Sequence, residues 1–452
     1  MDKIREEKRA NPRVKAKVKV DVSKNISGSS IDLSESGLSF NASENISSPA
    51  FSLQIYFPDE DLKFRTEARL VWNRDLENGT ASYGVEFVNL KDTQKYTLRK
   101  ELIMIQIRGL LNEIKDPQTK KDISDFFLKD MLAYISEITK IASSLPKDNE
   151  YSEEIERKIS QLTNEILLKG YCLEELIENK TIMNKNKENF RFLIGAWAYR
   201  SPMTKRAFDK PKGYPGDYLM LENVYNHQPL TKEGIGFYFD EYFLNSPYAV
   251  AVRCRKDKLR GFIEREIKQE ALKNIKIFNI ACGSCREITE MPFTLFRDKT
   301  ITFTCLDWDE DALEFSRDKV KGFPSNVKFN FIKEDIMNLI KDLAIVSSFE
   351  KQDLVYSIGL IDYLPDRVLK LFMQFFYGIL KAKGKLILTH KNREKTFSPI
   401  GPDWFCNWKF VPRNKEEVTH LFYSSGIKNY SLSSETDEFN DIFYFTFTKL
   451  KE

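Results

Sequence analysis

The spacing of hydrophobic residues divides the chain into three stretches. Residues 14–90 contain short runs in which apolar and polar residues alternate, separated by clusters of Ser, Asn and Gly. A period of two is typical of strands with one buried face, and several short strands at this spacing favour a small antiparallel barrel or sandwich. Over residues 92–200 the apolar residues recur every three or four positions, which predicts about four helices.

After residue 273, strand-like and helix-like segments alternate. The short apolar strand candidates are KIFNIA, TFTCLD, KFNFIKED, DLVYSI and KLILTH. This order predicts βαβ units and a doubly wound parallel sheet, to which the end of the chain adds a hairpin. We therefore predict a multidomain fold: a small antiparallel β-barrel over 1–95, a helical connecting segment over 96–200, and a Rossmann-like α/β domain over 201–452.

Composition and charge narrow the class of protein. The chain has 452 residues, 42% hydrophobic and 30% charged, as in globular proteins. Its net charge of +3 argues against a nucleic-acid polymer as the main partner. No run reaches the ~18 apolar residues of a membrane span, the start has no apolar core for a signal peptide, and the cysteines are too scattered for a disulfide scaffold. We expect a cytoplasmic protein, and whether it forms a homodimer is left open.

Two short motifs near the N-terminus carry candidate chemistry. Arg9 and Arg13 are four residues apart, and Asp32, Ser34 and Gly37 follow at a turn between two predicted strands. Arginine can grip a phosphate or the O6/N7 edge of guanine with paired hydrogen bonds, and a carboxylate can accept from a guanine N–H. Glycine lets backbone approach a ligand closely. On spacing alone, a solvated basic arm and an ordinary turn remain the favoured alternative.

The RxxxR and (D/N)xSxxG motifs, followed by ARLVW and YGVEFVNL, resemble the PilZ domain, a cyclic di-GMP receptor built on a small β-barrel. The resemblance covers about residues 3–95. It implies that the nucleotide contacts are Arg9, Arg13, Asp32, Ser34 and Gly37. It also implies a core or barrel-closing role for Gly84 and Phe87.

The strand ends of the α/β stretch carry a second set of candidates. The first strand runs into a turn of small residues, Ala281 to Glu287, where a doubly wound fold binds a nucleotide. Asp307 ends the second strand, where a carboxylate can accept from a ribose diol, and Asp335 follows the third, near an adenine amino group. The turn lacks the full dinucleotide glycine fingerprint, and nicotinamide binding stays as an alternative.

These sites and the terminal hairpin resemble a class I methyltransferase that binds S-adenosylmethionine. The cofactor contacts implied by this resemblance are Asn279, Ala281, Cys282, Gly283, Glu287, Asp307, Trp308, Asp335, Ile336, Tyr356, Ser357 and Gly359. The CxxC spacing of Cys282 and Cys285 has no second pair or nearby His to complete it, so we predict no metal site.

A narrower resemblance comes from residues 210–220, KPKGYPGDYLM, and residues 356–364, YSIGLIDYL. With the ACG loop they are similar to the extracellular-factor family, which makes 3-hydroxypalmitic acid methyl ester, a bacterial quorum signal. The resemblance covers about 165–450 and implies methylation of an acyl carboxylate. The family's usual ACGPAxE reads ACGSCRE here. The candidate catalytic residues are Tyr214 and Asp217 in a glycine-rich lid, Asp362, Tyr363 and His390.

A carboxylate acceptor is already ionised at neutral pH, so its methylation needs no general base. We expect Asp217 and Asp362 to bind the methionine amine or a substrate hydroxyl, and a loop or helix cap stays open as the alternative for both. His390 is a base, a substrate contact or a structural residue. The aromatic cluster around Trp404 and Trp408 lines an acyl pocket or forms plain core.

We predict a cyclic di-GMP-responsive methyltransferase that esterifies the carboxylate of a 3-hydroxy fatty acid or a related small molecule. In this hypothesis the nucleotide reorders the N-terminal arm, and the helical segment passes the change to the lid around Tyr214. One alternative is a methyltransferase of another small metabolite. The other is a cyclic di-GMP receptor with a non-catalytic S-adenosylmethionine-binding domain that acts through protein contacts.

Overall fold

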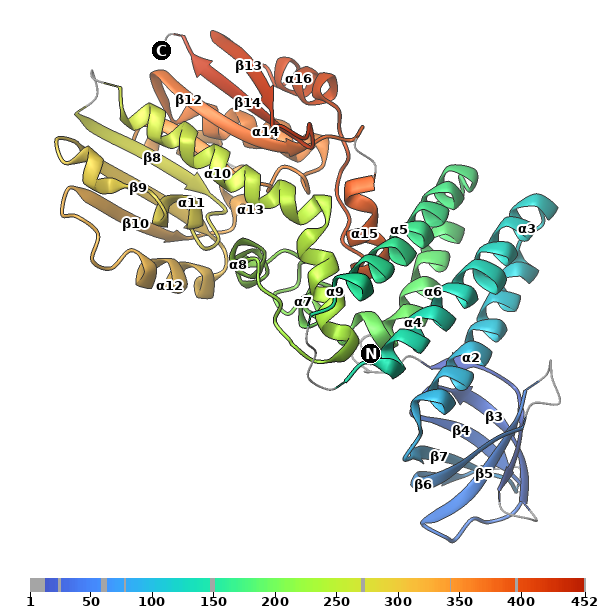
Figure 1. Cartoon of the computed structure of the whole chain (residues 1–452). Coiled ribbons are helices and arrows are strands. Elements are labelled where there is room, and N and C mark those ends of the chain that lie inside the picture. Colours follow the sequence, from blue (N-terminus) through green and yellow to red (C-terminus); the bar gives the residue numbers. More distant parts are fainter. Residues whose placement is uncertain are drawn as a thin grey trace. The chain divides into compact units, whose positions relative to one another are not determined.

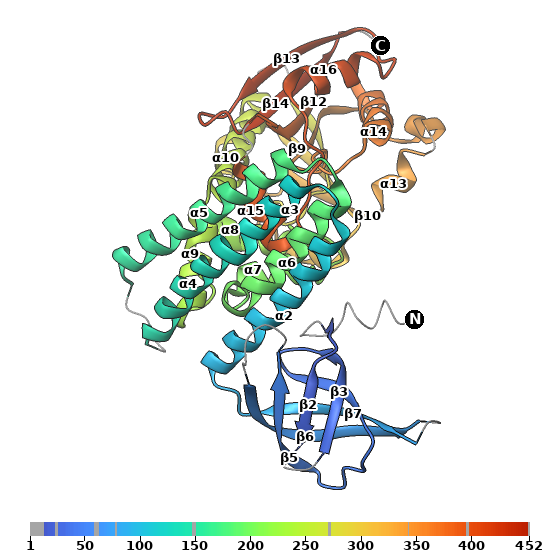
Figure 2. The same ribbon diagram turned by 90° about the vertical axis from the view of Figure 1, so that its right-hand side faces the viewer.

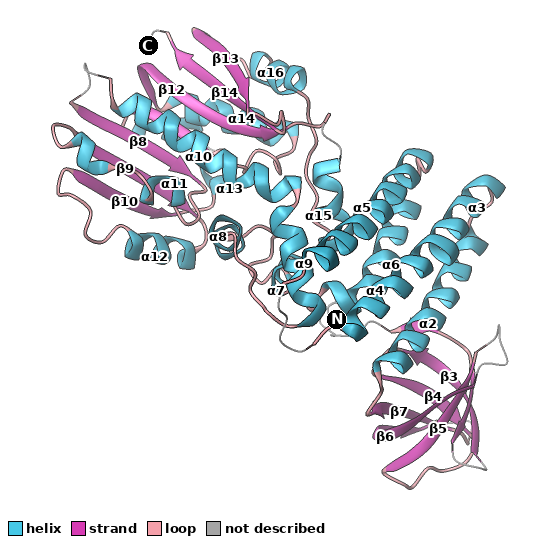
Figure 3. Ribbon diagram, in the orientation of Figure 1, coloured by secondary structure: helices cyan, strands magenta, loops and turns pink. Residues whose placement is uncertain are grey.

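The computed structural model describes residues 13–22, 26–57, 63–76, 79–146, 151–269, 273–341, 343–394 and 397–450, without the side chains of residues 92, 343–345 and 397–399. The chain forms two compact units. The first comprises Met1–Ser143 and Leu162–Ala196, and the second comprises Ser144–Gln161 and Trp197–Glu452. Figure 3 shows strands at the start of the chain, helices after them, and a mixed α/β region at the end.

The first unit begins with an antiparallel barrel (Figure 2). Its strands are β1 (Val14–Lys15), β2 (Lys19–Val22), β3 (Ile26–Leu33), β4 (Gly37–Ala42), β5 (Ala50–Tyr56), β6 (Lys63–Asp75) and β7 (Ala81–Val88). They follow the order β1-β3-β2-β5-β6-β7-β4, and pairing of β3 with β4 closes the sheet. Alternate residues such as Val20, Phe40 and Leu53 fill the interior, as the period of two predicts. The predicted antiparallel barrel is confirmed.

Helices follow the barrel, as predicted. They are α2 (Asp92–Glu113), α3 (Pro117–Asp125), the π-helical turn η1 (Phe126–Met131), α4 (Leu132–Ser144), α5 (Glu153–Leu176) and α6 (Lys180–Ala198). Asp116 caps α3, because its side chain accepts from Thr119 N at 2.7 Å, and Pro117 occupies the first turn, where its missing N–H costs nothing. Among the described residues, no helix is long and apolar enough to cross a membrane.

Four helices precede the sheet of the second unit: α7 (Pro202–Asp209), α8 (Tyr218–Asn226), α9 (Gly234–Asn245) and α10 (Pro247–Ile267). The strands are β8 (Asn274–Ile280), β9 (Thr300–Asp307), β10 (Val327–Lys333), β11 (Gln352–Ser357), β12 (Leu380–Lys391), β13 (Tyr430–Thr436) and β14 (Ile442–Lys449). Their order is β10-β9-β8-β11-β12-β14-β13, in which β8 to β12 run parallel and β14 is antiparallel to both its neighbours. The predicted doubly wound sheet and its terminal hairpin are confirmed.

Helices pack on both faces of the sheet of the second unit (Figure 1). Short elements join the strands: α11 (Arg286–Thr289), η2 (Phe293–Phe296), α12 (Glu310–Lys319), α13 (Ile336–Leu339), η3 (Leu343–Ser348), α14 (Asp366–Gly378), α15 (Phe397–Cys406) and α16 (Lys415–Tyr423). Residues of α10 pack in one hydrophobic cluster with the sheet, and residues of α14 and α16 pack in another. From β8 the strand order runs outward in both directions, so a crevice opens at the carboxyl ends of β8 and β11.

Candidate functional site

A cavity of about 360 Å³ lies at the carboxyl ends of β8 to β12 in the second unit. Its volume falls within the range of small-molecule sites, roughly 300–1,000 Å³. The predicted site residues that line it are Tyr214, Ala281, Gly283, Asp307, Trp308, Asp335, Ile336, Gly359, Asp362 and Tyr363. Those that do not line it are Asp217, Asn279, Cys282, Glu287, Tyr356, Ser357 and His390.

The loop after β8 has a backbone suited to close approach of a ligand. Ala281, Gly283 and Cys285 adopt left-handed φ angles of 52°, 52° and 50°. Such angles strain the non-glycine residues, and strain of this kind gathers at functional sites. A Cβ placed on Gly283 would meet nothing nearer than Tyr218 Cβ at 3.9 Å. The backbone at Gly283 therefore borders open space at the cavity wall.

Asp307 fixes this loop to the end of β9. Its Oδ2 accepts from Gly283 N at 2.8 Å, and its Oδ1 accepts from Asp309 N at 3.0 Å. Burial raises the pKa of the Asp307 carboxyl above its usual range, and the two backbone donors oppose that shift. Each oxygen keeps further lone pairs that can accept hydrogen bonds. The carboxylate can therefore hold the loop and still accept from a ribose diol.

Several predicted cofactor contacts lie beneath the loop instead of in the cavity wall. Glu287 Oε1 accepts from Asn279 Nδ2 at 2.9 Å and from the Tyr356 hydroxyl at 2.7 Å. All three side chains are buried, and burial raises the pKa of Glu287 to about 8. This network ties α11 to β8 and β11. Its members support the loop from inside the protein.

The glycine-rich segment before α8 borders the other side of the cavity. The Tyr214 ring lies 5.6 Å from the Trp308 ring, between centroids. At Gly216, where φ is 73°, a Cβ would lie 2.5 Å from Trp408 Cζ2, so only glycine fits there. Lys212, in the same segment, pairs with Asp309 at 3.0 Å and also with Asp311. These contacts fasten the segment to the loop after β9.

Asp217 has a different setting from the one predicted. Its Oδ1 accepts from Met220 N at 3.0 Å and so caps α8, and its Oδ2 pairs with Arg206 Nη2 at 2.9 Å. The side chain is buried away from the cavity lining. The structure therefore shows a helix cap and an ion pair at this position.

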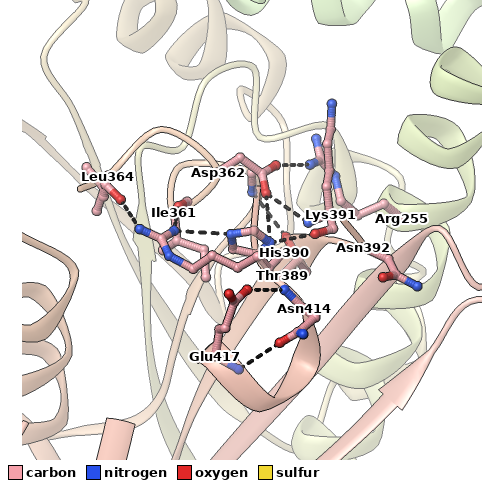
Figure 4. Close-up of polar contacts among 12 residues, drawn as sticks. Arg255, Ile361, Asp362, Leu364, Thr389, His390, Lys391, Asn392, Asn414 and Glu417 are labelled. Carbon is pink, nitrogen blue, oxygen red and sulfur yellow. Dashed lines mark hydrogen bonds and ion pairs between the residues drawn. The ribbon is translucent and has the colours of Figure 1, made fainter. Parts of the chain in front are cut away.

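At the opposite end of the cavity, beyond β11 and β12, Asp362 contacts both Lys391 and Arg255 (Figure 4). Its Oδ1 accepts from the backbone N of Lys391 at 2.9 Å, and its Oδ2 lies 3.8 Å from Arg255 Nη1. At Gly359, φ is 77° and a Cβ would lie 2.6 Å from the same Arg255 nitrogen. Two basic side chains, Arg255 and Lys391, thus line this end of the cavity beside one carboxylate.

His390 precedes Lys391 but faces the interior. Its Nδ1 lies 2.6 Å from the Lys391 carbonyl oxygen, and its Nε2 lies 3.2 Å from Arg413 Nη1. A carbonyl only accepts and a guanidinium only donates, so the neutral ring with its proton on Nδ1 satisfies both contacts. Burial lowers the pKa of His390, which favours this neutral form.

Sequence reasoning missed several residues of the cavity wall. The missed residues that line the cavity are Tyr218, Leu221, Tyr248, Arg255 and Lys391. Trp408 also lines it; the sequence had left open whether its aromatic cluster forms a pocket or plain core. Tyr248 and Arg255 lie on α10, outside every motif. Lys391 directly follows the His390 candidate on β12. The one signal available in the sequence was its position next to His390, because successive side chains of a strand point to opposite faces of the sheet. If His390 faces the interior, Lys391 faces the other way.

In the first unit, part of the nucleotide motif is assembled around Asp32. Arg13 Nη1 lies 2.6 Å from Asp32 Oδ1, and both side chains are partly exposed. Ser34 is buried, and its hydroxyl donates to the Gly37 carbonyl at 3.0 Å. A Cβ on Gly37 would lie 2.0 Å from the Val85 carbonyl oxygen, so β4 can pair with β7 only through glycine. Arg9, the remaining candidate, lies outside the described residues.

A buried ion pair connects this motif to the helices. Glu35, inside the DxSxxG loop, pairs with Arg99 of α2, and both side chains are about nine-tenths buried. Arg99 Nη1 also donates to the carbonyl oxygens of Phe192 at 3.2 Å and Leu193 at 3.1 Å, both on α6. One guanidinium therefore joins the candidate nucleotide loop to α2 and α6 within the first unit.

Comparison with known families identifies the start of the chain. Residues 3–103 match the PilZ domain. The matched region contains the barrel, the RxxxR motif and the DxSxxG loop of the PilZ domain. The comparison with curated proteins found no match.

Solved structures of low similarity were also found. A possible exported protein from Bordetella parapertussis is 15% identical, with a TM-score of 0.43 over 75% of this chain and 100% of that chain. Magnesium protoporphyrin IX methyltransferase from Synechocystis PCC 6803 with bound SAM is 10% identical, with a TM-score of 0.32 over 45% and 84%. A SAM-dependent methyltransferase from Archaeoglobus fulgidus is 15% identical, with a TM-score of 0.31 over 43% and 94%. Scores this low do not establish a shared fold, so the fold of the second unit stands on its own strand order.

Proposed function

We propose that the second unit is an S-adenosylmethionine-dependent methyltransferase whose acceptor is the carboxylate of a 3-hydroxy fatty acid or a related small molecule. We further propose that cyclic di-GMP binds the PilZ region and controls the reaction. The observation that carries the first proposal is the cavity at the strand ends, with acids at its β9 and β10 end and the basic side chains Arg255 and Lys391 at its β11 and β12 end.

The residues of the β9 and β10 end fit the adenosine part of this cofactor. Asp307 ends β9 with free lone pairs for a ribose diol, and Glu334 and Asp335 follow β10, where they can accept from an adenine amino group. Gly283 leaves the backbone open on the cavity side. Cofactor binding at these residues is consistent with the dimensions and donor set of the wall.

The other end of the cavity fits an anionic acceptor. S-adenosylmethionine, when bound, supplies a methyl group on a sulfonium, and transfer to an ionised carboxylate forms the O–CH3 bond while the S–CH3 bond breaks and its electron pair stays on sulfur. No proton has to leave the acceptor, so the chain needs to orient the carboxylate and exclude water. Arg255 and the aromatic side chains Tyr248, Tyr363 and Trp408 line this end of the cavity, which supports these roles.

The buried pair of Glu35 and Arg99 supports control by cyclic di-GMP. Glu35 lies inside the candidate nucleotide loop, so a ligand that reshapes this loop acts on Arg99 and, through it, on α6. The α6 helix ends at Ala198, where the chain continues into the second unit. Such control requires that the ligand bind two conformations with different affinity.

The test is transfer of labelled methyl from S-adenosylmethionine to a panel of 3-hydroxy fatty acids by the full chain, with and without cyclic di-GMP. We expect a methyl ester whose rate of formation depends on the nucleotide, and we expect Asp307→Ala to lose cofactor binding. Cofactor binding without transfer to any acid would favour the receptor that acts through protein contacts. Unchanged cofactor affinity in Asp307→Ala would reject the site.

A further inference from the structure

One basic group at the acceptor end of the cavity has no partner. Lys391 lines the cavity, and its Nζ is buried without a hydrogen-bond partner among the residues that the structure describes. Burying an amine in this way is costly, whether it is charged or neutral, because water is lost and nothing replaces it. Asp362 accepts from the backbone N of Lys391 at 2.9 Å, and its carboxylate makes no hydrogen bond to Nζ.

The surroundings of Nζ suit a positive charge. The ammonium lies 3.6 Å from the centroid of the Tyr248 ring and 3.4 Å from that of the Phe410 ring. Aromatic faces attract cations, and more strongly in a desolvated site. Burial lowers the pKa of Lys391 well below its usual range, while Asp362 opposes this shift and Arg255 adds to it. An anion placed against Nζ would therefore favour the charged amine.

We infer that Lys391 binds the carboxylate of the methyl acceptor through its ammonium group, an inference that rests on the proposed function. The aromatic rings fix the position of Nζ, and the carboxylate supplies the missing partner. One carboxylate oxygen bonds to Nζ while the other stays free to attack. Arg255, whose Nε is likewise buried without a hydrogen-bond partner among the described residues, adds a second positive charge on the same wall.

The position of Lys391 in the sheet sets it apart from the candidate ribose ligand. Asp307, the candidate ribose ligand, ends β9, whereas Lys391 ends β12. In the order β9-β8-β11-β12 these strands are three spacings apart, which is about 14 Å at the usual separation of neighbouring strands. The ammonium thus lies on the acceptor side of the switch point between β8 and β11.

Lys391→Met keeps an unbranched side chain that is one atom shorter and removes the amine. Lys381→Met is the matched control, because Lys381 lies on the same strand and pairs instead with Asp353 at 2.6 Å. The full chain is assayed for esterification of a series of 3-hydroxy fatty acids of increasing length. The best acid and its methyl ester are then used as binding probes, in the presence of S-adenosylhomocysteine, whose affinity is measured separately.

We expect the wild-type protein to bind the acid at least about tenfold more tightly than the ester, and Lys391→Met to bind the two within about twofold. S-adenosylhomocysteine affinity should stay within about twofold in both variants, and Lys381→Met should keep the preference for the acid. Lys391→Met should unfold at the same temperature as the wild type or higher, because it removes an unpaired buried amine. If it does not fold, Lys391→Gln is measured in the same way.

Each other outcome overturns the inference. An unchanged preference for the acid in Lys391→Met would mean that the ammonium does not bind the acceptor, while ester formation would leave the proposed function intact. A loss of S-adenosylhomocysteine affinity of about tenfold or more would assign the ammonium to the cofactor instead. Failure of the wild-type protein to esterify any acid would reject the proposed function, and the role of Lys391 with it.

Discussion

The buried carboxyl of Glu287 gives the second unit a pH dependence that one substitution should remove. Its pKa is raised from 4.5 to about 8, mainly because burial disfavours the charged form. Between these values the folded protein keeps a proton that the unfolded chain has lost. Stability therefore falls as the pH rises from about 5 to 8, and this contribution levels off above the folded pKa.

The size of the effect follows from the two pKa values. At roughly 1.4 kcal/mol per pH unit, and with partial ionisation near each pKa, the loss between pH 6 and pH 8 is about 2 kcal/mol. For a unit of this size that corresponds to a fall of about 4–8 °C in the unfolding temperature. Glu287→Gln keeps the acceptor for Asn279 Nδ2 and the Tyr356 hydroxyl but does not titrate.

The assay is the unfolding temperature of the full chain at pH 6, 7 and 8, followed by hydrogen exchange in peptides from β8 and α11. The difference between the wild type and Glu287→Gln isolates this carboxyl together with the buried groups that interact with it, such as Cys285 and Tyr356. Groups away from this network, His390 among them, contribute equally to both proteins. Glu314→Gln, on an exposed position of α12, is the control and should follow the wild type. Parallel curves for the wild type and Glu287→Gln would refute the reasoning.

Three further substitutions test the other parts of the structure. Arg13→Ala should weaken cyclic di-GMP binding by roughly ten- to a hundredfold, because Arg13, which pairs with Asp32 in the structure, would no longer make its proposed charge-assisted bond to the nucleotide. Titration calorimetry measures the affinity, and an unchanged value would place the nucleotide elsewhere. Glu35→Gln should reduce the effect of the nucleotide on the methyl-transfer rate by about fivefold or more at saturating nucleotide; a full response would exclude the α6 contact from the coupling. Gly216→Ala should lower kcat/KM about tenfold, because the added Cβ would collide with Trp408. Gly213 has a similar φ angle and open space around it, so Gly213→Ala should lower kcat/KM less. Equal losses in the two variants would contradict a steric cause.

The fold was predictable because its signals are local. Alternating residues in the barrel and apolar segments separated by helices in the second unit follow directly from the two side-chain periods. Asp307 was predictable for the same reason, since the end of a strand can be located in the sequence and parallel strand ends share one edge of the sheet. Gly37 carried a motif signal, although its 2.0 Å conflict with the Val85 carbonyl is visible only in the folded barrel.

Partners that depend on how segments fold back on one another were not predictable. Asp217 lies in a glycine-rich segment that suits a lid over the cavity. Its carboxylate, however, is occupied by Arg206 and by the first turn of α8. On β12 the choice between His390 and Lys391 depends on which face of the strand meets the cavity, and a shift of one residue reverses the answer. Arg255 reaches the cavity from α10, and nothing in its local sequence distinguishes it from the other basic residues of that helix.

The distribution of charge along the cavity limits which acceptors the second unit can use. Acids at the β9 and β10 end suit the hydroxyl and amino groups of adenosine, and the cations Arg255 and Lys391 lie at the other end beside the single carboxylate of Asp362. A protonated amine would meet the positive charge of Arg255 there, and only the carboxylate of Asp362 would oppose that charge. A hydroxyl acceptor would need a base, and a carboxylate would not. In the proposed function an anionic acceptor suits this wall, because an anion placed against the unpaired amine of Lys391 would stabilise its charged form.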